Sequence, residues 1–311
     1  MHKIILLLFV FTYQVSTAQK HEYVYKNPSD SSFNCYLGVL PKTDKIKGLI
    51  IRDFSSLPNI NKKSRYRWME FALENDIAVL YTVTSHFFPE LFYNDAGPIL
   101  LDEMLHEFLL KHQIPKNNIF IGGISTSGTR ALRFAQYCAE GKSKYNHQIK
   151  GVFAVDSPLD IERFYRSAEE HKKYFATSMK EEAELVLKAF PEQLAGTPHD
   201  HLDYYQDASV FSASDVYGGN AKHYLQTALL LIHEPDIDWW LHERGASYYD
   251  INSYDIAGFA QYLQSIQHKD IELISTSGKG FDKQGKRNCH SWTIVDEAYL
   301  IEWVLKRIQN N

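Results

Sequence analysis

The sequence has few cysteines. Only three occur among its 311 residues, Cys35, Cys138 and Cys289. This number is too small for a disulfide framework, and an odd count leaves at least one thiol unpaired. Their spacing matches no zinc-binding motif. The sequence therefore excludes the small disulfide-rich and zinc-ribbon classes, and Cys289 is best interpreted as a small packing residue.

An excess of positive charge is also absent. The chain has 33 Lys and Arg residues against 38 Asp and Glu residues, a net charge of −5. The basic residues are scattered, so nothing indicates a nucleic-acid surface. No repeat or low-complexity tract is found, and no apolar run beyond the N-terminal region is long enough for a membrane helix. We expect no nucleic-acid partner, no stable membrane insertion and no particular protein partner.

The N-terminus carries a targeting pattern. Met1-His2-Lys3 precedes an apolar stretch from Ile4 to Phe11, and small residues follow at Ser16 to Ala18. This pattern predicts a signal peptide over residues 1–18 and a secreted or periplasmic protein. A buried N-terminal strand is the alternative. No cysteine follows the cleavage region, so a lipoprotein anchor is not indicated.

The rest of the chain alternates between apolar runs and helical patterns. With 44% hydrophobic residues, it can bury one large core. Strands are predicted within residues 33–40, 47–53, 77–83, 118–122, 151–156, 228–233 and 271–275, and helices near 63–74, 100–112, 129–135, 253–267 and 292–308. This order predicts an α/β fold with a mostly parallel, doubly wound sheet. Residues 157–221 break the alternation, and we expect them to form a helical cap within one domain spanning 19–311.

One turn in this pattern favours catalysis. The run Gly123-Ile124-Ser125-Thr126-Ser127-Gly128 lies between an apolar strand and a helical segment. Small residues allow the sharp bend of a nucleophile elbow, in which a serine hydroxyl rises above the sheet edge. Ser125 is the candidate nucleophile. A plain turn serine or an anion site at the helix N-terminus are the alternatives.

The elbow resembles that of the α/β-hydrolase family, and the resemblance covers most of the chain after residue 45. The family's histidine would correspond to His290, which lies in the run Asn288-Cys289-His290-Ser291-Trp292 before the last helix. The family's acid would lie in the cluster Glu234-Pro235-Asp236-Ile237-Asp238. The chain order Ser, Asp, His is preserved. The chain departs from the G-x-S-x-G motif, because Ser127 replaces the last glycine and Gly128 follows it.

The resemblance implies a Ser-His-Asp triad of Ser125, His290 and Asp236. The histidine takes the serine proton, and the acid fixes the imidazole and stabilises its charged form. Asp236 is favoured because it lies near the strand end. Asp238 is the reserve, and Asp156, after the preceding strand, is the third candidate.

The same resemblance implies an oxyanion hole of backbone N–H groups. Thr126 would supply the first N–H group. Phe54 or Ser55, which follow the strand that ends at Asp53, would supply the second. Aromatic residues of the cap, Tyr204, Tyr205 and Phe211, are expected to influence substrate choice.

No cofactor is expected. The cap contains His199, Asp200, His201 and Asp203, whose side chains are suitable zinc ligands. Their spacing fits no established motif, and a solvated loop explains them as well, so no metal ligand is assigned.

Together these observations predict a secreted serine hydrolase that cleaves a small-molecule carboxylic ester through an acyl-enzyme. Two alternatives remain open. One is a secreted peptidase of the same fold, and the other is a non-catalytic binding protein that retains the fold.

Overall fold

The computed structural model describes residues 20–27, 29–60 and 67–309. The predicted signal peptide lies outside these ranges. In the part described, no helix has the length and apolar character needed to cross a membrane.

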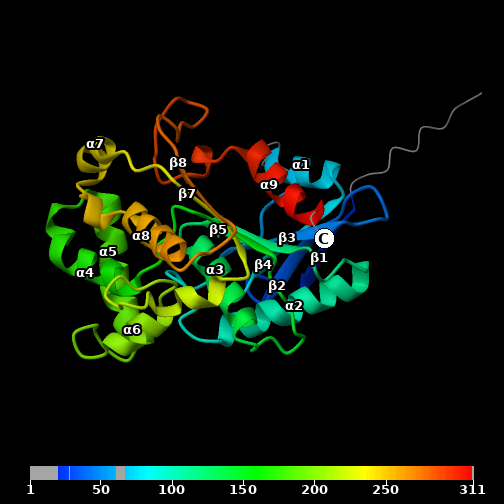
Figure 1. Cartoon of the computed structure of the whole chain (residues 1–311), viewed down its shortest axis with the longest axis horizontal. Helices are drawn as coiled ribbons and strands as arrows, with labels where there is room; N and C mark the ends of the chain where they lie inside the picture. The colour runs from blue at the N-terminus through cyan, green and yellow to red at the C-terminus, as the bar shows by residue number, and fades with distance from the viewer. Residues whose placement is uncertain (1–19, 28, 61–66, 310–311) are drawn as a thin grey trace, which may run out of the picture.

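An eight-stranded sheet runs through the centre of the molecule (Figure 1). Its order is β1-β2-β4-β3-β5-β6-β7-β8. β1 and β2 are antiparallel to their neighbours, and all the other pairs are parallel. The strands are β1 (His21–Tyr25), β2 (Cys35–Val39), β3 (Gly48–Asp53), β4 (Ile77–Val83), β5 (Ile119–Ile124), β6 (Gly151–Val155), β7 (Ala228–His233) and β8 (Ile271–Ser275).

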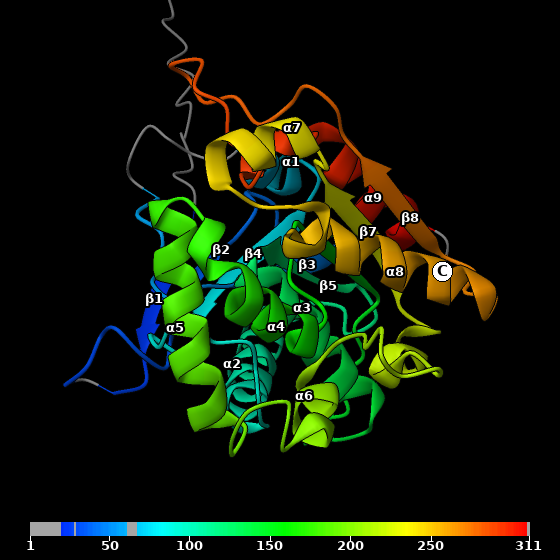
Figure 2. The same ribbon diagram turned by 90° about the vertical axis from the view of Figure 1, so that its left-hand side faces the viewer.

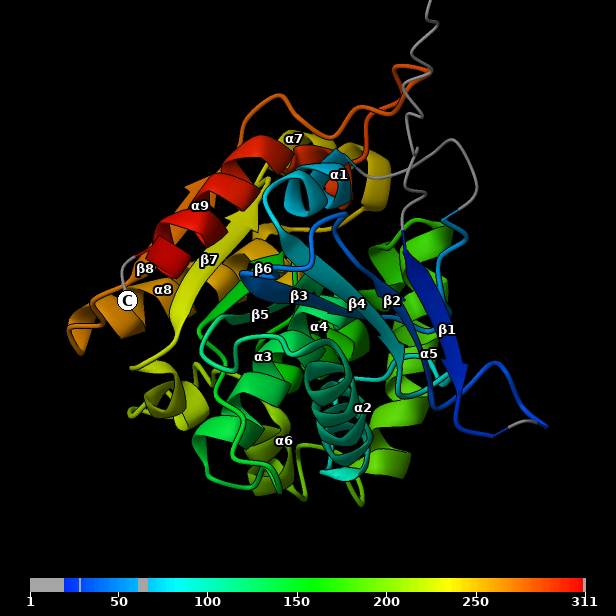
Figure 3. The ribbon, with the colours of Figure 1, turned by 90° about the vertical axis from the view of Figure 1, so that its right-hand side faces the viewer.

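Helices cover both faces of the sheet (Figure 3). On one face, α1 (Arg67–Glu74) and α9 (Glu297–Gln309) pack through Trp68 and Trp303. The other face carries α2 (Ala96–His112), α3 (Thr126–Ala139) and α8 (Asn252–Ser265). Since parallel strands are buried on both faces, they read as continuous apolar runs, and the predicted mostly parallel α/β architecture is confirmed.

The segment from 157 to 221, called the insertion below, lies between β6 and β7. It contains α4 (Ile161–His171), α5 (Thr177–Gln193) and α6 (Leu202–Ala208), which Figure 2 shows gathered beside the sheet. These helices share a hydrophobic cluster that includes Tyr165, Phe190 and Tyr205. The short helix α7 (Ile237–Trp239) and a π-helical turn, Trp240–Arg244, follow β7.

A buried histidine makes the stability of this fold sensitive to acid. His147 is 3% exposed, and neither of its ring nitrogens has a hydrogen-bond partner among the described residues. Burial lowers the pKa of His147 from 6.5 to about 4, although the charge of Asp102 opposes the shift. The unfolded chain therefore binds this proton more readily than the folded chain, and the folded state loses stability as pH falls below 6.5.

We expect His147→Leu to reduce this acid sensitivity. The loss for the wild-type chain is about 2 kcal/mol at pH 5, and leucine removes the titrating group without breaking a side-chain hydrogen bond. Urea unfolding from pH 7.5 to pH 4.5 measures it. The exposed His242, changed to leucine, is the control. Parallel curves for the wild-type chain and His147→Leu would contradict the prediction.

Candidate active site

Ser125 lies at a strained bend between β5 and α3. Its backbone has φ 56° and ψ −134°, a conformation that non-glycine residues rarely adopt. The Ser125 N–H donates to the carbonyl oxygen of Val155 at 2.9 Å, which fixes the bend to the end of β6. The side chain is partly exposed. The local geometry is that of a nucleophile elbow.

Two glycines make this bend possible. A Cβ on Gly123 would lie 2.6 Å from the carbonyl carbon of Ser127, and one on Gly128 would lie 2.9 Å from the carbonyl oxygen of Gly123 and overlap the Ser157 hydroxyl. Ser127 is buried, and its hydroxyl donates to the carbonyl oxygen of Asp53. Serine therefore fits where the family motif has glycine, and it ties α3 to the end of β3.

We expect Gly123→Ala to distort the elbow, because the new methyl group meets backbone atoms that cannot move aside. The cost is about 1–3 kcal/mol of stability, together with at least a tenfold slower reaction of Ser125 with a fluorophosphonate. Thermal unfolding and the labelling rate measure the two effects. Ser127→Ala is the matched control, since it loses one hydrogen bond without a clash. Equal labelling of both variants would contradict the prediction.

A buried ion pair supports the same region. Asp53, at the end of β3, pairs with Arg130 of α3 at 2.9 Å, and both side chains are nearly inaccessible. The Asp53 carboxylate also accepts hydrogen bonds from the hydroxyls of Thr82 and Thr84. These partners come from β4, the residue just after it and α3, so the end of β3 is held against the start of α3.

His290 lies in the loop between β8 and α9, and its partner is Asp156. The His290 Nδ1 and Asp156 Oδ2 atoms are 2.6 Å apart. Burial disfavours the charged imidazole, but the negative charge and hydrogen bond of Asp156 outweigh it and raise the pKa of His290. With Nδ1 engaged, Nε2 is left to exchange protons, and the side chain remains 30% exposed.

Asp156 is held at the end of β6 by its backbone. Its φ is 42°, its N–H donates to the carbonyl oxygen of Ile232 at 2.8 Å, and its own carbonyl oxygen accepts from Asn252 at 2.9 Å. The residue is 1% exposed. This turn directs the carboxylate to His290.

The expectation that Asp236 partners the histidine disagrees with this geometry. Asp236 caps α7 by accepting from the Trp239 N–H at 3.0 Å, and it pairs with Arg287. Both interactions hold the pKa of Asp236 below its ordinary value. Asp238, the reserve candidate, is exposed. The third candidate, Asp156, occupies the position that the sequence analysis gave to Asp236.

The predicted oxyanion donors differ in availability. Thr126 is the first residue of α3, so its N–H has no acceptor within the helix. The Phe54 N–H already donates to the carbonyl oxygen of Thr82 at 3.0 Å. Phe54 is therefore unsuitable as an oxyanion donor. The other candidate in that loop, Ser55, has an N–H that makes no hydrogen bond within the described ranges.

Ser125 and His290 line the same pocket, which has a volume of about 160 Å³. The insertion contributes Phe164 from α4 and Ser178, Met179 and Glu182 from α5. The insertion also contributes Pro158, and the remaining lining residues are Trp240, Arg244, Asp250, Ile251 and Asn252. Tyr204, Tyr205 and Phe211, which were expected to influence substrate choice, are not among the lining residues, and Tyr205 and Phe211 are buried in hydrophobic clusters.

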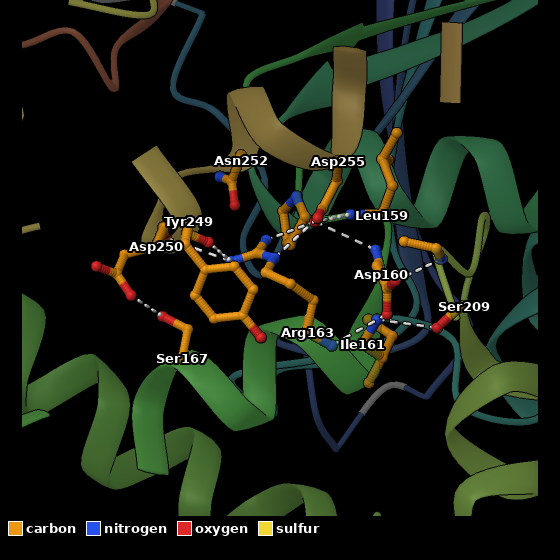
Figure 4. A network of polar contacts seen from close by, with 12 residues as sticks. Leu159, Asp160, Ile161, Arg163, Ser167, Ser209, Tyr249, Asp250, Asn252 and Asp255 are labelled. Atoms are coloured by element: carbon orange, nitrogen blue, oxygen red, sulfur yellow. Dashed lines mark hydrogen bonds and ion pairs between the residues drawn. The ribbon is translucent and has the colours of Figure 1, made fainter. Parts of the chain in front are cut away.

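A buried polar network fixes this side of the pocket (Figure 4). Arg163 of α4 binds the carboxylate of Asp255 in α8 and reaches the carbonyl oxygens of Tyr249 and Asp250. The backbone N–H groups of Leu159 and Asp160 donate to the same Asp255 carboxylate. The network connects the insertion to α8, next to the pocket residues Asp250 to Asn252.

The acidic and histidine-containing clusters have protein partners. In the insertion, His199 pairs with Glu169 at 2.8 Å, and Asp200 accepts from Thr197. Glu234, Asp236 and Cys289 have potential ligand atoms within 4.8 Å of one another. However, Arg287 pairs with both carboxylates, and burial raises the pKa of Cys289 to about 12, so its thiol stays protonated. This chemistry does not favour a cation there.

No protein-family model matches the chain, and the search of curated proteins gave no match. Solved structures are similar at low sequence identity. Carboxyl esterase 2 from the fungus Tuber melanosporum is 12% identical, with a TM-score of 0.56 and coverage of 96% of this chain and 88% of the esterase. Esterase B from Lactobacillus rhamnosis is 11% identical, with a TM-score of 0.58 and coverage of 94% and 86%.

A peptidase is similar to the same extent. The acylaminoacyl peptidase of Pyrococcus horikoshii is 12% identical, with a TM-score of 0.56 and coverage of 94% of this chain but 42% of the peptidase. The present chain therefore corresponds to less than half of that protein. From the strand order and these similarities, the chain has the α/β-hydrolase fold.

Proposed function

We propose that this protein is a serine hydrolase that cleaves a carboxylic ester through an acyl-enzyme, with Ser125 as nucleophile, His290 as base and Asp156 as acid. The observation that carries the proposal is the 2.6 Å contact between His290 Nδ1 and Asp156, at a pocket that both His290 and Ser125 line. A histidine anchored at Nδ1 by a buried carboxylate is suited to accept a proton at Nε2.

In the proposed reaction the Ser125 oxygen attacks the ester carbonyl, and its proton passes to His290 Nε2. The negative charge on the carbonyl oxygen is stabilised by backbone N–H groups, of which Thr126 supplies one and Ser55 is the candidate for the other. His290 then gives its proton to the departing alcohol, which leaves the acyl group on Ser125. A water molecule, activated by His290, releases the acid and restores the serine.

The pocket supports a small substrate. Its volume of about 160 Å³ is below the range usual for drug-sized ligands, and its lining is apolar at Phe164, Met179 and Trp240. The peptidase and esterase neighbours share the fold, so the fold does not choose between ester and amide. We favour a short-chain ester on pocket size, with the insertion acting as the lid that limits chain length.

Hydrolysis of nitrophenyl esters of graded acyl length tests this function. We expect the wild-type chain to prefer short acyl groups, and Met179→Ala to move the preference toward longer ones because it enlarges the pocket. Tyr204→Ala, at an exposed position outside the pocket, is the control. Absence of hydrolysis together with absence of fluorophosphonate labelling would favour the non-catalytic binding protein.

A further inference from the structure

His233 is a buried histidine that the proposed mechanism leaves unused. It ends β7, is 3% exposed, and contacts the hydroxyl of Ser275 through Nε2. Its other ring nitrogen, Nδ1, is buried and has no hydrogen-bond partner among the described residues. A buried polar atom without a partner costs about 1–3 kcal/mol, so this nitrogen calls for an explanation.

The carboxylate of Asp156 also has a buried oxygen without a hydrogen-bond partner among the described residues. Oδ2 binds His290, whereas Oδ1 is buried and has no partner within the described ranges. Asp156 and His233 lie on neighbouring strands. Val155 and Ile232, the residues that precede them, are paired in the sheet, and the Asp156 N–H donates to the carbonyl oxygen of Ile232. Two residues at the ends of neighbouring strands thus each carry, within the described part of the chain, a buried atom without a partner: an acceptor oxygen on Asp156 and a ring nitrogen on His233.

The protonation state of His233 fits this pairing. Burial lowers the pKa of His233, and the negative charges of Asp156 and then Glu234 oppose the shift only in part. The ring is therefore neutral near pH 7 and carries one N–H. Either atom of the contact between Nε2 and the Ser275 hydroxyl can donate, and a donating hydroxyl places that N–H at Nδ1.

We propose that His233 is a positioning residue for the triad acid, and that its Nδ1–H donates to Asp156 Oδ1 through one bridging water. The role rests on the proposed function. It extends the series Ser125, His290 and Asp156 by a fourth group, which fixes the carboxylate that in turn fixes the catalytic imidazole. His233 acts through Asp156 and does not touch the substrate.

Other charged groups surround these residues and must be held constant in a test. Glu182 from α5 and Arg244 from the π-helical turn act on His290, with opposite signs. Glu234, the residue after His233, pairs with Arg287 and places negative charge near the His233 ring, and its Oε2 is also buried without a partner in the part of the chain described. Glu234 is therefore the rival acceptor for the His233 N–H.

Two amide substitutions separate the two sides of the ring. In His233→Asn the side-chain NH₂ falls near the position of Nδ1, so the donor toward Asp156 is kept. In His233→Gln the amide falls near Nε2, where its oxygen accepts from the Ser275 hydroxyl, so that contact is kept and the donor toward Asp156 is lost. Both variants lose the imidazole and bury an amide, which makes them matched controls for a purely structural effect.

The measurement is the pH profile of kcat/KM for a nitrophenyl ester, together with fluorophosphonate labelling of Ser125. For His233→Gln we expect roughly a tenfold loss in kcat, with little change in KM. Its acid limb should move to higher pH, because Asp156 without its donor stabilises the charged form of His290 more strongly. His233→Asn should remain within about threefold of the wild-type chain and keep its acid limb.

The outcomes are distinct. A tenfold difference between the two variants with a displaced acid limb supports the positioning role. Equal rates and unchanged acid limbs, in a wild-type chain that labels at Ser125, overturn it and leave the N–H to Glu234 or to a packing role. If the wild-type chain takes no label at Ser125, the proposed function itself fails and the positioning role falls with it.

Discussion

Ser125→Ala should abolish fluorophosphonate labelling and lower kcat for ester hydrolysis by on the order of 10⁶-fold. Ser125 occupies the strained bend between β5 and α3, where its N–H is fixed to Val155, and the nearby Ser127 hydroxyl is already bonded to Asp53. Without the serine oxygen, His290 has no nucleophile to activate, and the residual rate comes from substrate binding and backbone donors.

The variant should keep its fold, because alanine removes only the hydroxyl, and the structure shows no cap hydrogen bond made by that side chain. Thermal unfolding of the variant against the wild-type chain provides the control. Mass spectrometry of the labelled wild-type peptide identifies the modified residue. Labelling that persists in Ser125→Ala would place the nucleophile elsewhere and remove the basis of the proposed function.

The fold could be predicted from the sequence because its central strands are buried on both faces. The apolar runs at 47–53, 77–83 and 228–233 differ from these observed strands by no more than one residue, and the partly exposed edge strand at 271–275 was also predicted with its observed bounds. No strand was predicted at the position of the edge strand β1 (His21–Tyr25), because its residues are at most partly buried and its polar side chains resemble a loop. Helix ends also differ: α2 begins at Ala96, four residues before the predicted start.

The candidate site was only partly predictable, for a physical reason. Ser125 has a local signal, since the strand, the small residues and the helix are contiguous in the chain. The acid has no such local signal, because aspartates follow both β6 and β7. Choosing either one preserves the chain order Ser, Asp, His. What separates them is tertiary: Arg287 holds Asp236 from a distant loop, and the positive φ of Asp156 turns that residue toward His290.

The oxyanion loop shows the same limit. Phe54 directly follows the strand that ends at Asp53, as the family resemblance requires, yet its N–H is used by the sheet through Thr82. The pairing of one N–H with a neighbouring strand cannot be read from spacing. The buried Arg130, which holds Asp53 from α3, had no sequence signal beyond its place in a helical pattern.

Asp156→Asn and Asp236→Asn together test the acid. We expect Asp156→Asn to lower kcat by on the order of 10⁴-fold, because an amide no longer stabilises the imidazolium and allows the ring to adopt the wrong tautomer. The negative charge of Asp156 raises the pKa of His290. Its loss should therefore also move the acid limb of kcat/KM to lower pH. Steady-state kinetics from pH 5 to pH 9 measure both effects.

Asp236→Asn is the matched control, since it makes the same chemical change at the end of the adjacent strand. It should change kcat by less than about threefold, because Asp236 is engaged with Arg287 and the cap of α7, and a partly exposed ion pair of this kind contributes about 1 kcal/mol. If Asp236→Asn instead caused the larger loss, the loop after β7 would have to rearrange on substrate binding, and Asp156 would be a buried structural carboxylate that orients His290 only in the free protein.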